Sequence, residues 1–170
     1  HGLLYECSRE AGLPNGFGIG YEGLLSLSAK ECDVLVLPSL AYAPIEITDK
    51  IRRLYLEGVN LIAVSDVTGL EDLFGVLPDA HNSKVNCVCY RGLHEYVREN
   101  EACLAYKPNG ASAVMTSDTG EPLIMRHERT VLLNTAVTNM GSADSQYMSI
   151  AGTLHIVGQS VRTALGDMLT

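Results

Sequence analysis

The chain has 170 residues, of which 46% are hydrophobic and 19% are charged, as expected for one globular domain with a core. The net charge is −8 at pH 7 and Lys and Arg form no cluster, which argues against nucleic acid and membranes as partners. No apolar run approaches the roughly 18 residues that a transmembrane helix needs. Because the chain starts with His1 rather than Met, we expect residues 1–170 to be a single domain excised from a longer chain.

The amino-terminal segment predicts a helix followed by a glycine-rich loop. Apolar residues at helical spacing run from Leu3 to Ala11, and Gly12 is a stop signal. The glycines of Gly16 to Gly20 follow a helix and have G-x-G-x-G spacing, whereas a dinucleotide-binding loop needs G-x-G-x-x-G after a strand. We therefore predict a loop, then a short strand at Ile19 to Tyr21 and a short connection at Gly23 to Ser28.

The next segment predicts two parallel strands joined by a helix. Asp33 to Ser39 holds an unbroken apolar run, typical of a central strand that is buried on both faces. Ile47 to Glu57 has helical periodicity, with Thr48 as a candidate N-cap and Gly58 as the stop. Leu61 to Val64 is a second buried strand. The helix should pack on the sheet through one stripe, made of Ile51, Leu54 and Tyr55.

The second half of the chain predicts antiparallel strands and a final helix. Its strand-like segments have no helix between them and are Val85 to Tyr90, Ala102 to Tyr106, Ala111 to Thr116, Leu123 to Met125 and Val131 to Leu133. Pro108 to Gly110 should turn the second of these back on the third, and Ser117 to Glu121 should form the next turn. Steps of three and four between apolar residues then predict a long amphipathic helix from Gln146 to Leu169.

The five cysteines predict reduced thiols rather than disulfides or a metal centre. Their number is odd and their spacings match no disulfide framework: Cys7, Cys32, Cys87, Cys89 and Cys103. Cys87 and Cys89 should point to the same face of a strand, but one C-x-C without a second ligand pair is a weak zinc signal. We expect no metal, no cofactor and a reducing, cytoplasmic location.

Polar residues gather at the predicted carboxyl end of the parallel strands, where ligands bind in open α/β sheets. The loop after Leu61 to Val64 leads into a short helix, Gly69 to Phe74, that Gly75 closes. The candidate ligand-binding residues are Ser39, Tyr42, Ser65, Asp66 and Thr68. This pattern allows a small-molecule or sugar-binding module.

A hydrolase that uses Ser65 is a further alternative, with Asp66 and one of three histidines, His81, His94 or His127, as partners. A serine at the end of a strand is in the right place for a nucleophile. The G-x-S-x-G motif is absent, however, and we expect the sharp strand-to-helix turn to be hard to make without its glycines. We therefore predict no catalytic residue.

Several of these segments together resemble the trimerisation domain of family 42 β-galactosidases. The matching pieces are Asp33 to Pro38, the helix that ends Leu56-Glu57-Gly58, the strand Asn60 to Val64 and Gly69 to Gly75. Gly120 to Arg126 followed by Thr130 to Thr135 is similar to the paired strands of that domain. Val59 stands where the family has the second glycine of its E-G-G segment.

The resemblance covers most of Asp33 to Leu169, and it implies a fold for this part of the chain. It is an α/β fold of the flavodoxin-like or class I glutamine amidotransferase-like type. A parallel sheet is flanked by helices and carries additional antiparallel strands and a long C-terminal helix. The nucleophilic cysteine of an amidotransferase would follow Leu61 to Val64, where this chain has Ser65 or Asp66. The amidotransferase His-x-Glu pair is absent too, because His127 and Glu128 are adjacent.

The function that the resemblance implies is non-catalytic. It is that of an accessory or oligomerisation domain of a bacterial β-galactosidase-type glycoside hydrolase, which acts in carbohydrate metabolism. The partners expected from it are further copies of this chain or a catalytic domain of the same parent chain.

Overall fold

The computed structural model describes residues 20–37, 40–139, 153–156 and 167. The helices in these ranges are α2 Gly20–Ser26, α3 Ile45–Leu56 and α4 Glu71–Phe74. Seven strands form one sheet: β1 Val34–Leu37, β2 Asn60–Val64, β3 Val76–Tyr90, β4 Leu93–Pro108, β5 Ser112–Ser117, β6 Pro122–His127 and β7 Thr130–Leu133. A separate sheet pairs β8 Ala136–Asn139 with β9 Thr153–Ile156. None of the described helices has the length and apolar character needed to cross a membrane.

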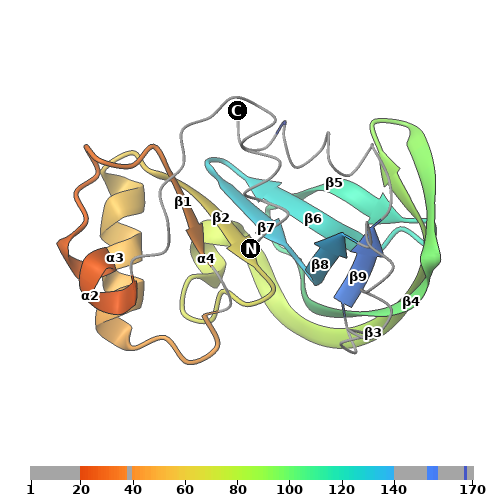
Figure 1. Cartoon of the computed structure of the whole chain (residues 1–170), viewed down its shortest axis with the longest axis horizontal. Helices are drawn as coiled ribbons and strands as arrows, with labels where there is room; N and C mark the ends of the chain where they lie inside the picture. Colours follow the sequence, from red (N-terminus) through yellow and green to blue (C-terminus); the bar gives the residue numbers. More distant parts are fainter. Residues whose placement is uncertain (1–19, 38–39, 140–152, 157–166, 168–170) are drawn as a thin grey trace.

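The sheet is mixed, with the strand order β1-β2-β7-β6-β5-β3-β4 (Figure 1). β1, β2 and β7 run parallel, and α3 connects β1 to β2, so the predicted strand-helix-strand unit is confirmed. The prediction that β1 is a central strand buried on both faces is wrong. β1 is the edge strand of this sheet and Val36 is 37% exposed, because β7 rather than β1 lies on the inner side of β2.

The amphipathic pattern of α3 sets its packing. Ile47, Ile51, Leu54 and Tyr55 are all buried, which confirms the predicted stripe and adds Ile47 to it. The helix begins two residues earlier than predicted, directly after Pro44, whose fixed φ suits a helix start. Thr48 therefore lies inside the helix and its hydroxyl donates to the Ile45 carbonyl, so it is not the N-cap. Gly58 follows the helix with a φ of 112°, as its predicted role as a stop requires.

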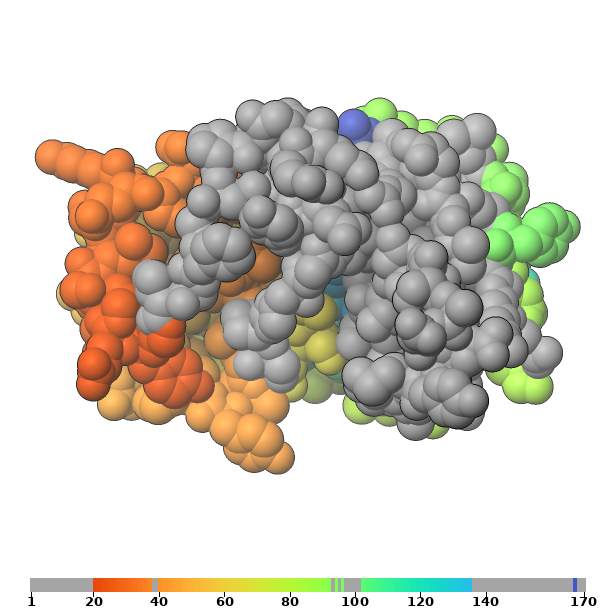
Figure 2. Space-filling view, viewed as in Figure 1, coloured from red at the N-terminus to blue at the C-terminus, as the bar shows by residue number. Residues whose placement is uncertain are grey.

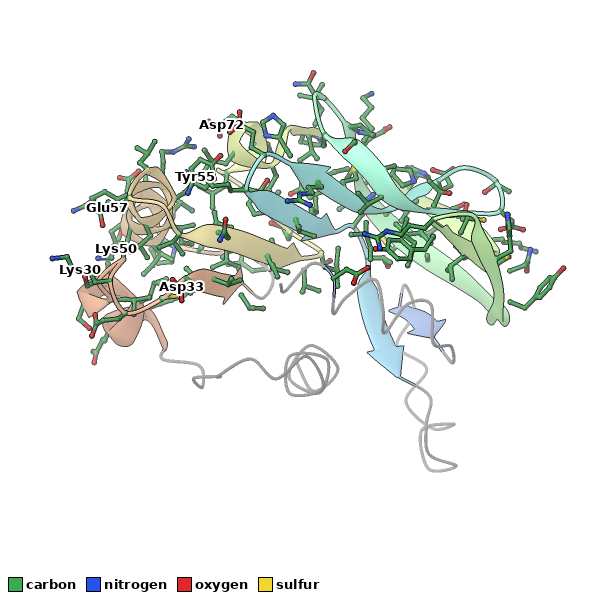
Figure 3. The ribbon with its side chains drawn as sticks, turned by 90° about the horizontal axis from the view of Figure 1, so that it is seen from above. Lys30, Asp33, Lys50, Tyr55, Glu57 and Asp72 are labelled. Atoms are coloured by element: carbon green, nitrogen blue, oxygen red, sulfur yellow. The ribbon has the colours of Figure 1, made fainter. Side chains whose placement is uncertain are left out.

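Each face of the sheet is covered by its own core. Alternation along β2 points Leu61 and Ala63 to the face that packs against α3 and α4, and points Ile62 to the opposite face. Figure 3 shows α3 and α4 on the same side of the sheet, with Tyr55 directed between α3 and the strands. Both faces of β2 are thus buried, which fits its unbroken apolar sequence.

The predicted antiparallel half is confirmed, but its strand order differs from the expectation. β3 and β4 form a long hairpin, and β3, not β4, pairs with β5. The hairpin predicted across Pro108 to Gly110 is therefore wrong. The backbone N–H groups of Asn109 and Ala111 donate to the Gly75 carbonyl at 2.7 and 3.0 Å, which directs the chain over the start of β3. Figure 2 shows the hairpin atoms, in green, at the opposite end of the molecule from α2 and α3, in red and orange.

Two predictions near the chain ends are also corrected. Ile19 to Tyr21 does not form a strand, because the described residues from Gly20 to Ser26 are the helix α2. One continuous helix from Gln146 to Leu169 is wrong, because Thr153–Ile156 pairs in parallel with β8 as the strand β9. Glycines flank this strand at 152 and 158 and weaken a helix there. The predicted helix from Leu3 to Ala11 and most of residues 146–169 lie outside the described residues.

Candidate functional site

The turn that follows β2 is the candidate site, and it is built around Ser65. Ser65 has a φ of 71°, and the Asp66 N–H donates to the Val64 carbonyl at 2.9 Å. A hydrogen bond across one residue with positive φ is a γ-turn of the rare, strained kind. This is not a strand-to-helix turn of the G-x-S-x-G kind, because residues 65–70 separate β2 from α4.

Neighbouring strands and loops hold this turn in place. The Ser65 N–H donates to the Leu133 carbonyl at 2.8 Å, which extends the pairing of β2 with β7. The Asp66 carbonyl accepts from the Leu40 N–H at 3.1 Å, and its carboxylate accepts from the Thr68 N–H at 2.9 Å. The Asp66 side chain thus closes a local turn of the type that Asp residues favour.

Tyr106 of β4 holds the same loop through a hydrogen bond. Its hydroxyl accepts from the Val67 N–H at 3.1 Å in a buried environment, which gives a partner to a backbone donor that has no strand neighbour. Burial raises the pKa of Tyr106 above its ordinary value.

Asn134, the residue directly after β7, positions the Tyr106 backbone. Its amide oxygen accepts from the Tyr106 N–H at 3.0 Å, and its amide nitrogen donates to the Tyr106 and Pro122 carbonyls at 2.8 and 2.9 Å. The side chain is fully buried and every polar atom has a partner. Asn134 therefore joins β4, β6 and β7 at the edge of the sheet where the candidate site lies.

An ion pair closes the outer side of the loop. The Arg52 guanidinium of α3 contacts both carboxylate oxygens of Asp72 at 2.6 and 2.8 Å, and it also donates to the Gly69 carbonyl at 3.1 Å. The hydrogen bond from Arg52 holds the pKa of Asp72 below its usual range. Glu71 accepts from the Gly69 N–H at 3.0 Å. The loop is thereby attached to α3 and α4.

The structure brings three of the five predicted ligand-binding residues together. Ser65 and Asp66 are half-buried on one loop, and Thr68 is exposed beside them. Tyr42 is 96% exposed, so its ring extends into solvent rather than lining a site. Ser39 lies outside the described residues.

The three candidate bases are all paired with groups other than Ser65. His81 lies 2.8 Å from the Asp79 carbonyl and 3.2 Å from Glu121, and these contacts, the carbonyl first, raise the pKa of His81. His94 contacts the Cys89 sulfur, and His127 contacts the Leu73 carbonyl.

His127 is also at the wrong end of the sheet to act as a base for Ser65. Thr130 pairs with Leu61 and Leu133 with Val64, so β7 starts beside the start of β2. His127 precedes β7, whereas Ser65 follows β2. The two side chains therefore start from opposite ends of the strand pair, beyond hydrogen-bond reach.

Tyr106 and Asn134 are the site residues that sequence reasoning missed. Asn134 carries a usable signal, because a polar residue directly after an apolar strand is placed at the edge of a sheet. Tyr106 carries none, because its partner Val67 is 39 residues away in the chain.

Comparison with known proteins gives matches in structure but not in sequence. No protein-family model matches the chain, and no curated protein matches it. An exo-β-1,4-mannosidase, Op5Man5 from Opitutaceae bacterium strain TAV5, aligns with a TM-score of 0.59 and 15% identity. A β-galactosidase from the psychrophilic Marinomonas ef1 aligns with a TM-score of 0.59 and 16% identity. Gan42B, a GH42 β-galactosidase, aligns with a TM-score of 0.59 and 15% identity.

These alignments cover 78% of this chain but only 25%, 21% and 22% of the three enzymes, in the same order. The chain thus spans about a quarter of their length or less. At such low identity the likeness shows a shared fold. It confirms, at the level of fold, the resemblance to a part of family 42 β-galactosidases that the sequence suggested.

Proposed function

We propose that this chain is a non-catalytic accessory or oligomerisation domain of a larger, β-galactosidase-type glycoside hydrolase. The observation that carries the proposal is the uneven coverage of the structural matches. The fold accounts for 78% of this chain but for no more than 25% of each matched enzyme. The shared part is therefore one component of those enzymes.

The contacts around Ser65 support a structural role for the candidate site. The carboxylates of Asp66, Glu71 and Asp72 each accept a hydrogen bond from the loop or from Arg52. A catalytic carboxylate or serine needs a partner that faces a substrate, and the candidate histidines are paired elsewhere. The polar groups of this loop hold the strands and helices together.

Two exposed apolar side chains stand at the ends of α3. Ile45 and Leu56, the first and last residues of α3, are 75% and 74% exposed. Because they are about three turns apart, they lie on nearly the same side of the helix, with the charged residues Asp49 and Arg52 between them. Tyr42 is exposed shortly before the helix begins. Self-association, or contact with a catalytic domain of the same parent chain, would bury these three apolar side chains.

Light scattering over a range of concentrations tests the proposal. We expect the chain to form a dimer or trimer, and the double variant Ile45→Glu, Leu56→Glu to be monomeric. The matched control is Tyr96→Glu, which places a charge at an exposed residue of the hairpin and should leave the oligomer intact. A chain that is monomeric at every concentration would exclude self-association by this domain alone.

Two further measurements separate this proposal from its alternatives. A chromogenic β-galactoside should not be hydrolysed by the isolated chain. Turnover that Ser65→Ala abolishes would show a Ser65-dependent hydrolase instead. Galactose and lactose should not shift the backbone amide resonances of Ser65, Asp66 and Thr68. A saturable shift of these amides would show a sugar-binding module.

A further inference from the structure

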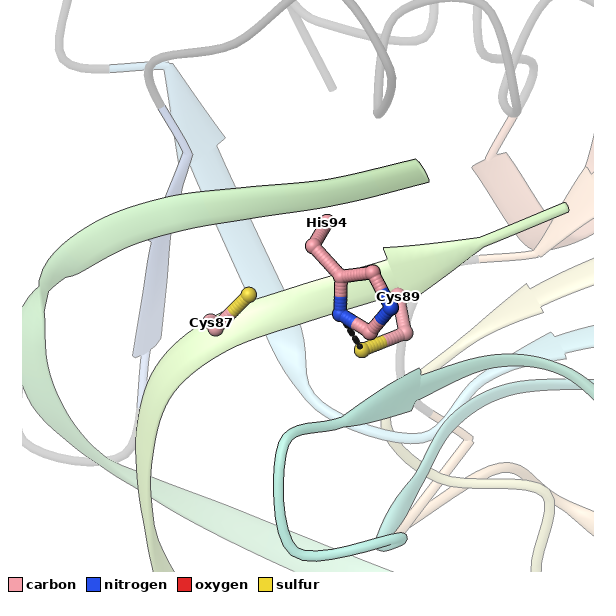
Figure 4. Close-up of side chains that lie close together, drawn as sticks. All are labelled: Cys87, Cys89 and His94. Atoms are coloured by element: carbon pink, nitrogen blue, oxygen red, sulfur yellow. Dashed lines mark hydrogen bonds between the residues drawn. The ribbon is translucent and has the colours of Figure 1, made fainter. Parts of the chain in front are cut away.

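The tip of the β3–β4 hairpin brings two cysteines and a histidine together. Arg91 and Gly92 connect the strands, and both have positive φ, 49° and 77°, as two-residue hairpin turns favour. This turn sets Cys89 directly opposite His94 in the register. The Cys89 sulfur and His94 Nδ1 are 3.0 Å apart (Figure 4).

Cys87 completes the group on the same face of the strand. It precedes Cys89 by two residues, and side chains alternate along a strand, so both sulfurs project to one side. In Figure 4 the Cys87 sulfur points toward Cys89 and His94. The three ligand atoms, two Sγ and one imidazole nitrogen, all lie within 4.8 Å of one another.

We propose that Cys87, Cys89 and His94 form a binding site for a thiophilic divalent cation of the Zn²⁺ class. Two thiolates and one imidazole are a preferred ligand set for Zn²⁺, and three protein ligands leave a fourth position open. This inference is independent of the proposed accessory function. It departs from the expectation, drawn from the sequence, that the chain holds no metal.

The distances fit such an ion after small side-chain movements. Tetrahedral Zn²⁺ places two thiolate sulfurs about 3.8 Å apart, and a sulfur and an imidazole nitrogen about 3.5 Å apart. The observed separations range from 3.0 Å to no more than 4.8 Å. Each pair therefore needs to change by about 1 Å or less, which rotation about side-chain torsions can supply.

The backbone that carries the ligands is held on both sides. β3 lies between β4 and β5, and Cys89 pairs with His94 on one side and with Thr116 on the other. The Asp118 N–H donates to the Cys87 carbonyl at 3.0 Å. Cys87 is buried, Cys89 is half-buried and His94 is exposed, so an ion can enter from the solvent side of the histidine.

A disulfide between Cys87 and Cys89 fits this geometry less well. Residues two apart on an extended strand have Cα atoms roughly 6.6 Å apart. This is near the upper limit for a disulfide, whose usual Cα separation is about 5.5–6 Å. Both cysteines are free thiols in the structure.

Binding has a defined proton balance. Zn²⁺ forms two Zn–S bonds and one Zn–N bond, and the two thiols lose their protons to the buffer while the imidazole binds in its neutral form. The two thiolates neutralise the charge of the ion. Up to two protons are therefore released per ion bound.

Titration of the reduced chain with Co²⁺ and Zn²⁺ tests the proposal. We expect one Co²⁺ per chain, a thiolate-to-cobalt charge-transfer band, displacement by Zn²⁺, and proton release visible as buffer-dependent heat in calorimetry. His94→Ala and Cys89→Ser should weaken binding about tenfold or more, since even changes outside the ligand set cost 10- to 100-fold. These two residues are not buried, so the variants should fold, which circular dichroism would check.

The matched control is Cys103→Ser, which removes an exposed thiol of β4 outside the group and should bind as the wild type does. Wild-type affinity in both His94→Ala and Cys89→Ser would overturn the proposal. So would the absence of a charge-transfer band in the wild-type chain with its thiols reduced.

Discussion

The two ends of the seven-stranded sheet build their sharp turns in different ways. At the parallel end, the strained turn at Ser65 is held by Leu133 and, through Val67, by Tyr106, both far away in the chain. At the hairpin end, Arg91 and Gly92 join two strands that pair with each other residue by residue. A turn of the first kind needs the whole sheet, whereas a turn of the second kind needs its two adjacent strands.

The largest effect on stability is expected at one of two glycines with positive φ, which lie near the two ends of β3. A Cβ at Gly75 would lie 2.7 Å from the His127 ring and 2.9 Å from the Ala111 backbone nitrogen, whereas a Cβ at Gly92 would meet nothing within 4 Å. Gly75→Ala should therefore lower the free energy of unfolding by roughly 2–5 kcal/mol, from backbone strain plus overpacking. Gly92→Ala should cost about 1 kcal/mol, from strain alone.

Chemical denaturation of both variants measures this difference. Equal losses of stability would show that the surroundings of Gly75 yield at no cost, and the contrast between a crowded and an open turn would then fail.

A medium effect is expected from the support that Tyr106 gives to the parallel end. Tyr106→Phe removes the acceptor of the buried Val67 N–H, and an unpaired buried donor costs about 1–3 kcal/mol. Tyr96→Phe is the matched control, because Tyr96 is 85% exposed. This variant should change the free energy of unfolding by no more than about 0.5 kcal/mol. Thermal unfolding of the two variants checks the ranking. A Tyr106→Phe variant as stable as the control would mean that the loop does not depend on this hydroxyl.

The smallest effect is the pH dependence of the ion pair between Arg52 and Asp72. Arg52 lowers the pKa of Asp72 in the folded chain below the ordinary value of about 3.9 that applies on unfolding. The contribution of the ion pair to the free energy of unfolding is therefore fully present above about pH 5. It is lost as the pH falls through the folded-state pKa of Asp72. Both side chains are partly exposed, so the pair should contribute about 0.2–1 kcal/mol.

Asp72→Asn and Arg52→Gln should each remove that contribution. Denaturation curves between pH 2 and 7 should show the variants less stable than the wild type at neutral pH and closer to it at pH 2. A stability difference that stays constant over this range would contradict the assignment.

Local patterns were enough to predict the parallel unit. The apolar runs of β1 and β2 and the stripe of α3 lie within one short stretch of chain, and each follows the period of its own element. The end of the short helix at Gly75 was also predicted, because glycine is the residue that most often ends a helix. In the structure Gly75 ends α4 with a positive φ. These features depend on residues that are neighbours in sequence.

Strand order could not be predicted in the same way. Nothing in the apolar run of β1 distinguishes an edge strand from a central one, because this depends on where β7 inserts. Likewise, the turn signal after β4 does not reveal that β3 separates β4 from β5. For β9, pairing with β8 prevailed over helical spacing.

By itself, the sequence determined the α/β class, the strand-helix-strand unit, the antiparallel second half and the polar loop at Ser65. The tertiary structure decided which side chains meet. It placed the Tyr106 hydroxyl under Val67 and His94 opposite Cys89. The physical reason is that the spacing of apolar residues indicates which face of a helix or strand is buried. Contacts between elements depend instead on strand order and register, which are set only when the whole sheet packs.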